Sequence, residues 1–270
     1  MSERTSRFLM VQNVQNSSSL DASPFDVYLQ PHSDDICFSL GAFAYQRHCG
    51  ILLTVFPISA YVPLRPGATR PAAEWVTKTR IAEDTAFAEA CGLNTHRLEL
   101  QDASRLGQLP FNLGRVDENL QRIKSPLLDA LLTAPPGKPS PIRPWLFCPS
   151  GIGGHVDHVA IRMLVNQNYD QLSPRYRIGF YEDLHYASSA AARSVGINNL
   201  FQEMRDRQLH RYDFPLGEYA SKKLALIQLY SSQFLAMPRS IEQFTPAVAS
   251  PDTAHEAIWS DEPIGPLLQT

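Results

Sequence analysis

Short apolar runs alternate with helix-length segments from about residue 25 to residue 181, and this alternation most restricts the folds open to the chain. The runs at 51–56 and 145–148 are almost entirely apolar, as is typical of strands covered on both faces. Strands that alternate with helices form a mostly parallel sheet, because each crossover helix returns the chain to the same end of the sheet. The sequence therefore predicts an α/β fold: a Rossmann-like, doubly wound sheet with helices on both faces.

The expected elements follow from apolar spacing and from glycine and proline positions. We expect strands at 25–29, 51–56, 97–100, 145–148 and 177–181. We expect helices at 36–48, 74–90, 115–132, 159–169 and 216–230. The segment after residue 238 is expected to be an irregular tail, and residues 1–24 a loose lead-in to a single domain over 25–270.

The composition excludes several classes of partner. The chain has 270 residues, 44% of them hydrophobic and 19% charged, with a net charge of -3. No basic run is present, which argues against nucleic acid as a partner. No apolar stretch approaches the roughly 20 residues that span a bilayer, and the first residues lack a signal-peptide core. The protein is therefore expected to be cytoplasmic, with its oligomeric state left open.

The four cysteines form no CxxC pair, so we expect free thiols and no thiolate-rich zinc site. Two polar clusters carry the chemistry instead. The string PHSDD (31–35) follows the first expected strand, and GGHVDH (153–158) follows the fourth. In doubly wound sheets ligands bind beyond the carboxyl ends of strands, near the switch in strand order. The two clusters are therefore expected to meet there.

Together the clusters offer three histidines and three carboxylates. Two histidines and one carboxylate form a common hydrolytic zinc set that leaves a position open for water. A spare carboxylate can accept a proton, and a spare histidine can stabilise an oxyanion. Each cluster alone also allows a structural interpretation: Asp34, Asp35 or Asp157 can cap a helix, and His155 can be a surface loop residue. A nucleotide-binding Rossmann site is disfavoured, because no GxGxxG turn follows the first strand.

These strings resemble the hallmarks of the LmbE/PIG-L family of zinc-dependent N-deacetylases, which have an AHPDDE-like string after the first strand and an HPDH-like string later. Further similar strings are TRIAEDTAFAEACGL (79–93), LELQDASRLG (98–107), FYEDLHYA (180–187) and KKLALIQLYSSQF (222–234). The resemblance covers roughly residues 25 to 234. It implies the LmbE-like version of the fold and removal of an acetyl group from N-acetylglucosamine-type sugars.

The resemblance also implies a role for individual residues. The zinc ligands would be His32, Asp35 and His158. Asp34 would be the general base, His155 the oxyanion stabiliser or general acid, and Asp157 the residue that orients His155. The metal itself is left open, since a set of two histidines and one carboxylate also accepts iron or another divalent ion.

Three further residues are candidates for substrate binding: Arg80, Asp102 and His185. Arg80 can instead pair with Glu83 or Asp84 on its own helix, and Asp102 can cap a loop. Three positions depart from the family pattern. Ile36 stands in place of the family glutamate, Ser33 in place of the proline after the histidine, and His185 in place of the proline of YEDLPYA.

The expected function is hydrolysis of an N-acetyl group on an amino sugar or glycoconjugate, by attack of metal-bound water. The alternative is a non-catalytic relative that binds a metal or a sugar on the same fold. The departure at Ile36 favours the alternative, whereas the complete set of histidines and carboxylates favours the enzyme. The sequence does not identify the N-acetylated substrate.

Overall fold

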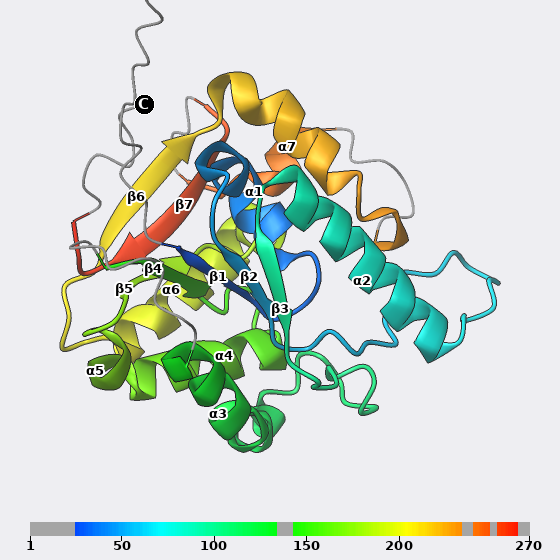
Figure 1. Cartoon of the computed structure of the whole chain (residues 1–270), viewed down its shortest axis with the longest axis horizontal. Coiled ribbons are helices and arrows are strands. Elements are labelled where there is room, and N and C mark those ends of the chain that lie inside the picture. Colours follow the sequence, from blue (N-terminus) through cyan, green and yellow to red (C-terminus); the bar gives the residue numbers. More distant parts are fainter. Residues whose placement is uncertain (1–24, 134–142, 234–239, 249–252, 264–270) are drawn as a thin grey trace, which may run out of the picture.

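The expected α/β architecture is confirmed by a computed structural model, which describes residues 25–133, 143–233, 240–248 and 253–263 (Figure 1). The expected lead-in, 1–24, lies outside the described residues. Within them, one sheet has the strand order β3-β2-β1-β4-β5-β7-β6. The strands are β1 (Val27–Gln30), β2 (Ile51–Thr54), β3 (Asn94–Arg97), β4 (Trp145–Pro149), β5 (Arg177–Tyr181), β6 (His210–Pro215) and β7 (His255–Ser260).

Strands β1 to β5 are parallel, and β7 runs antiparallel between β5 and β6. The prediction of an irregular tail was wrong at this point, because residues 255–260 form a largely buried internal strand. The strand begins with two polar residues, His255 and Glu256, so its sequence lacks the apolar run that predicts a buried strand. Both residues are nevertheless buried. Strand β6 was also not predicted. Strand β3 was expected three residues too late, whereas β5 has the predicted bounds.

The α-helices are α1 (Asp35–Arg47), α2 (Ala73–Ala90), α3 (Val116–Thr133), α4 (Val156–Gln167), α5 (Tyr169–Leu172), α6 (Ala190–Glu203) and α7 (Ala220–Ile227). Short 3-10 turns are η1 (Leu113–Arg115), η2 (Tyr186–Ser188), η3 (Gly217–Tyr219), η4 (Ser231–Gln233) and η5 (Ile241–Phe244). Helices α1, α2 and α7 cover one face of the sheet, and α3, α4 and α5 the other (Figure 1). No described helix has both the length and the apolar character that crossing a membrane requires.

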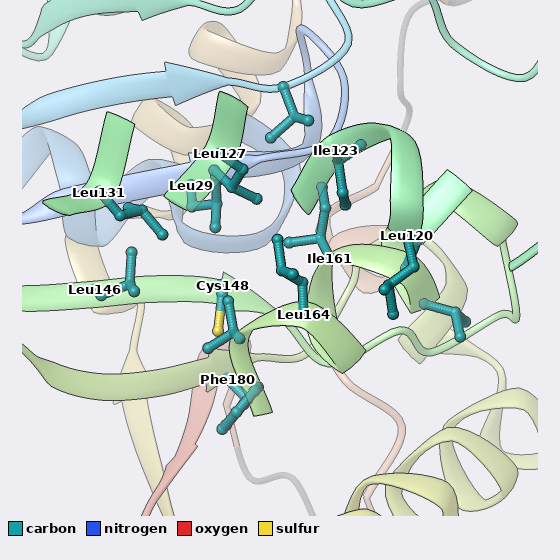
Figure 2. Close-up of a cluster of buried hydrophobic side chains, with 14 of the residues drawn as sticks. Leu29, Leu120, Ile123, Leu127, Leu131, Leu146, Cys148, Ile161, Leu164 and Phe180 are labelled. Carbon is teal, nitrogen blue, oxygen red and sulfur yellow. The ribbon is translucent and has the colours of Figure 1, made fainter. Parts of the chain in front are cut away.

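Two apolar cores hold these layers together, one on each face of the sheet. Successive residues of a strand point to opposite faces. Leu29 therefore packs with α3 and α4 in one core, shown in Figure 2, while Tyr28 packs with α1 and α2 in the other. Ile36 is buried in this second core, so the position that is glutamate in the family pattern serves packing here.

Helix α1 is kinked at Leu40, where φ is -131° and ψ is 24°. The kink is stabilised by Glu256 of β7, whose carboxylate accepts the amide hydrogens of Ala42 at 2.9 Å and Phe43 at 2.8 Å. Lys223 Nζ of α7 lies 2.8 Å from the same carboxylate, and both side chains are fully buried. The buried Glu256 carboxylate thus caps the second half of α1, and the buried Lys223 ammonium balances its negative charge.

Candidate metal centre and active site

The candidate site lies at the carboxyl ends of β1, β4 and β5. The strand order reverses between β1 and β4, the kind of switch point at which α/β sheets bind ligands. His32 follows β1, the segment 153–158 joins β4 to α4, and Asp183 follows β5. The two clusters do meet, since His32 Nε2 lies 3.0 Å from Asp157 Oδ2 across 125 positions of sequence.

Three side chains converge at the centre of the site. Nδ1 of His32 lies 3.3 Å from Oδ2 of Asp35, and Nε2 of His158 lies 3.4 Å from Oδ1 of Asp35. The same two histidine nitrogens are 3.3 Å apart. Tetrahedral ligands at about 2.1 Å from a zinc ion are separated by about 3.4 Å. Each pair of side chains in the predicted set therefore has the spacing of two ligands of one metal ion, with one Asp35 oxygen facing each histidine.

His155 lies close enough to offer a second ligand set. One ring nitrogen from each of His32, His155 and His158 lies within 4.8 Å of the others. Both sets share His32 and His158, and they differ in whether Asp35 or His155 is the third ligand. The shorter separations belong to the set with Asp35.

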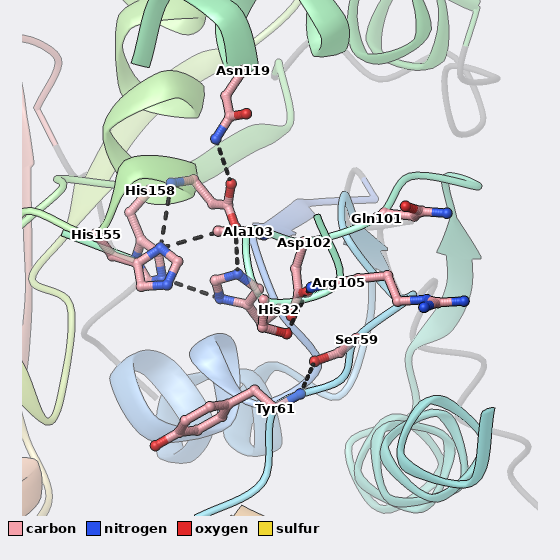
Figure 3. Close-up of polar contacts among 12 residues, drawn as sticks. His32, Ser59, Tyr61, Gln101, Asp102, Ala103, Arg105, Asn119, His155 and His158 are labelled. Atoms are coloured by element: carbon pink, nitrogen blue, oxygen red, sulfur yellow. Dashed lines mark hydrogen bonds and ion pairs between the residues drawn. The ribbon is translucent and has the colours of Figure 1, made fainter. Parts of the chain in front are cut away.

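The outer nitrogen of His32 is held by Asp157. Besides the 3.0 Å contact with His32, the carboxylate accepts hydrogen bonds from Asn119 Nδ2 at 3.0 Å and Ala103 N at 3.1 Å (Figure 3). A carboxylate on one nitrogen of a ligating histidine fixes its tautomer and leaves the other nitrogen for the metal. The family resemblance predicts that Asp157 orients His155, and in the structure the Asp157 carboxylate lies 3.9 Å from His155 Nδ1.

The outer nitrogen of His158 is held in the same way by Asp183. Oδ1 of Asp183 lies 2.7 Å from His158 Nδ1, and Oδ2 accepts hydrogen bonds from Ser150 Oγ at 2.7 Å and Ile152 N at 2.9 Å. All four of these residues are buried. Both histidines thus direct their second nitrogen toward Asp35, each backed by a carboxylate.

The electrostatics favour positive charge at this centre. Burial alone would lower the pKa of His32, but its hydrogen bonds with Asp157 and Asp35 prevail and raise the pKa to about 10. Burial would raise the pKa of Asp35, but His158 and His32 hold that pKa well below its usual range. Asp35 and Asp157, whose pKa values are both lowered beside the histidines, thus keep the negative charge that a divalent cation needs.

Asp34 stands beside this centre without capping α1. It is the N-cap residue, yet its side chain makes no capping hydrogen bond. Oδ1 instead accepts a hydrogen bond from Arg80 Nη2 at 3.1 Å, and Arg80 Nη1 donates to Ser59 Oγ at 3.2 Å. Burial, opposed by Arg80, raises the pKa of Asp34 to about 6. Arg80 therefore fixes the Asp34 carboxylate, which makes no hydrogen bond to the start of α1.

His155 is held in one orientation at the start of α4. Its Nδ1 accepts the amide hydrogen of Asp157 at 3.3 Å, so a neutral ring carries its proton on Nε2. Burial, followed by the neighbouring His32 and His158, lowers the pKa of His155 well below its ordinary value. The ring is therefore a neutral hydrogen-bond donor rather than a cation.

The three candidate substrate residues lie in different surroundings. The Arg80 guanidinium is buried against Asp34 and Ser59. Asp102 Oδ1 accepts hydrogen bonds from Ser104 Oγ at 2.7 Å and Arg105 N at 2.8 Å, which is the loop-capping arrangement. His185 is exposed, and its ring centroid lies 4.8 Å from that of Tyr186.

The sequence motifs do not include Asn119, Ser59 or Ser150, although each bonds to a carboxylate or a guanidinium of the site. Asn119 could have been noticed, because it is a polar residue among the buried positions of α3. The two serines give no comparable signal, since short hydroxyl residues are common after strands.

Comparisons with known proteins show likeness at the level of structure. No protein-family model matches the sequence, and no curated protein matches it. A deacetylase of the teicoplanin biosynthesis pathway matches with a TM-score of 0.61 and 16% identity, over 86% of this chain and 96% of that one. An A40926 pseudoaglycone deacetylase matches with a TM-score of 0.58 and 18% identity, over 87% and 96%.

A zinc-inhibited form of a teicoplanin deacetylase is also similar, with a TM-score of 0.55 and 17% identity over 86% of this chain. These similarities extend over nearly the whole length of each neighbour, so they concern the complete sheet and not one motif. The order of strands and the two clusters at their ends agree with the resemblance noted in the sequence. The chain therefore has the fold of the LmbE/PIG-L deacetylases.

Proposed function

We propose that the chain is a metal-dependent N-deacetylase that acts on an N-acetylated amino sugar or glycoconjugate. The proposal rests on one observation above all: the side chains of His32, Asp35 and His158 converge, and donor atoms of each pair lie 3.3 to 3.4 Å apart. It is supported by the neighbours of the same fold, which are deacetylases. Zinc fits this set, and iron(II) is compatible with it.

A divalent metal held there would lower the pKa of water and polarise an amide carbonyl. Asp34, fixed by Arg80, would take a proton from the attacking water. The Nε2–H of His155 would donate a hydrogen bond to the carbonyl oxygen as negative charge develops on it. The C–N bond then breaks, Asp34 passes its proton to the departing amine, and acetate is the second product.

The test compares three variants for metal content and for release of acetate from N-acetylglucosamine and its glycosides. Asp34→Asn should retain metal and lose about 10²- to 10⁴-fold in turnover, the usual contribution of a general base. His158→Ala should lose the metal. Asp117→Asn, an exposed change on α3, should alter neither quantity. Full turnover of Asp34→Asn would show that the base is wrongly assigned.

The third metal ligand is tested separately. If Asp35 is the ligand, Asp35→Asn weakens metal binding and His155→Gln retains it while losing turnover. The reverse pattern would move His155 into the ligand set. Stoichiometric metal without hydrolysis of any N-acetylated sugar would favour the non-catalytic alternative.

A further inference from the structure

Exposed apolar side chains lie on the loops at the same edge of the sheet as the candidate site. We define the apolar rim as Tyr61, Leu109, Phe111 and Tyr186. Tyr61 is 51% exposed, Leu109 73% and Phe111 56%, while Tyr186 is half-buried. These side chains lie on segments that follow β2, β3 and β5. Large apolar groups exposed together next to a polar site are typical of a ligand-binding surface.

Phe111 and Tyr186 form the side of the rim that contacts the histidines. The ring of Phe111 lies edge-on to His155, with centroids 5.8 Å apart, and 6.2 Å from the ring of Tyr186. Tyr186 in turn lies 6.1 Å from His158. Gly153 makes room for this ring, because a Cβ there would come within 2.5 Å of Tyr186 Cγ.

The backbone of Tyr61 is linked to Asp34 through Ser59 and Arg80. Its amide donates to Ser59 Oγ at 3.0 Å (Figure 3). The same oxygen accepts the hydrogen bond from Arg80. The neighbouring Ala60 amide donates to Ser104 Oγ at 3.1 Å, which ties this loop to the loop that carries Leu109 and Phe111. The rim is therefore attached to both sides of the site.

The contact of Phe111 with His155 indicates what the rim binds. A group resting on Phe111 would also lie near His155, the proposed donor to the amide carbonyl, as a part of the hydrolysed molecule would. We propose that the rim binds an alkyl or aryl group of the substrate, and that the chain prefers an amphiphilic amino-sugar conjugate to a free N-acetylated sugar. This inference rests on the proposed deacetylase function and specifies its substrate class.

The alkyl group has two possible points of attachment, which three matched substrates distinguish. These are N-acetylglucosamine, its hexyl β-glycoside and N-hexanoylglucosamine. Each buried methylene is worth about a factor of four, so burial of three should raise kcat/KM about 60-fold. A rise for the hexyl glycoside places the group on the sugar, and a rise for the hexanoyl amide places it on the acyl side.

Two variants test whether the rim causes a preference for a hexyl compound over the free sugar. Leu109→Ser and Phe111→Ser should each reduce the ratio of kcat/KM between the preferred hexyl compound and the free sugar. Val195→Ser is the matched control, because Val195 is 62% exposed on α6 and not part of the rim. The control should leave the ratio unchanged. Equal kcat/KM for all three substrates, or an unchanged ratio in both rim variants, would overturn the inference while deacetylation stands.

Calorimetric binding of the hexyl glycoside and the free sugar distinguishes failure of the deacetylase proposal from failure of the rim proposal. If no substrate is hydrolysed, the deacetylase proposal fails, and the two binding affinities still test whether the rim binds an alkyl group. Tighter binding of the hexyl glycoside that Leu109→Ser weakens would support the rim. Equal binding of both compounds would overturn it. A rim covered by a second copy of the chain would also overturn it, and would appear as a dimer that Leu109→Ser dissociates in gel filtration.

Discussion

Asp183 Oδ1 lies 2.7 Å from His158 Nδ1, and this contact leaves His158 Nε2 as the nitrogen that faces Asp35. Carboxylates that hold a ligating histidine in this way usually contribute 10- to 100-fold to metal affinity. Asp183→Asn should therefore weaken zinc binding by about 10- to 100-fold, measured by competition with a chromogenic chelator. Asp213→Asn, on exposed β6, is the control. Equal affinity in the two variants would remove Asp183 from the metal centre.

Arg80 holds Asp34 and Ser59 with two separate nitrogens, at 3.1 and 3.2 Å. Lysine cannot reproduce this fork. Arg80→Lys should therefore lower kcat by about 10- to 100-fold through misplacement of the base, with little change in KM. A substrate clamp, which the sequence suggested, would instead raise KM. Steady-state kinetics decides between them, with Arg115→Lys on the surface as the control.

Lys223 and Glu256 form a fully buried ion pair, with 2.8 Å between Nζ and Oε1. Lys223→Met should destabilise the protein by about 3–5 kcal/mol, because Glu256 keeps a buried charge without its cation. The double variant Lys223→Met/Glu256→Gln should recover part of this loss. Lys222→Met removes a half-exposed lysine that lies over the Tyr45 ring and should cost about 1 kcal/mol or less. Urea denaturation in which both single variants lose equally would contradict the role of the pair.

Glu182 is buried among Arg193, Arg211 and Trp259, with contacts between 2.6 and 2.9 Å. Burial would raise its pKa, but the two arginines prevail and lower it from 4.5. A lowered pKa in the folded state gives stability that is present above the unfolded pKa, near 4.5, and lost as the pH falls through the folded value.

Glu182→Gln should therefore be less stable than the wild type at pH 6, and this difference should shrink below about pH 4.5. Denaturation measured from pH 6 to pH 3 tests this, with exposed Glu218→Gln as the control. A difference in stability that stays constant with pH would show that Glu182 contributes by packing alone.

The sheet and the meeting of the two clusters were predictable, because apolar periodicity and the connection rules depend on local sequence. The place of β7 between β5 and β6 was not, since its buried polar residue Glu256 finds its partners, Lys223 and the amides of α1, far away in the sequence. Within the site, the sequence places Asp157 after β4 but does not give the direction of its side chain. In the structure the Asp157 carboxylate lies 3.0 Å from His32 Nε2 and 3.9 Å from His155 Nδ1.

The cap that Glu256 provides to Ala42 joins residues 214 positions apart. Closing so long a loop is slow and entropically costly, and contacts this distant delay folding. The final shape of the helix that begins at Asp35 thus depends on a strand much later in the chain. Amide hydrogens of α1 and β7 should consequently exchange together, as one cooperative unit.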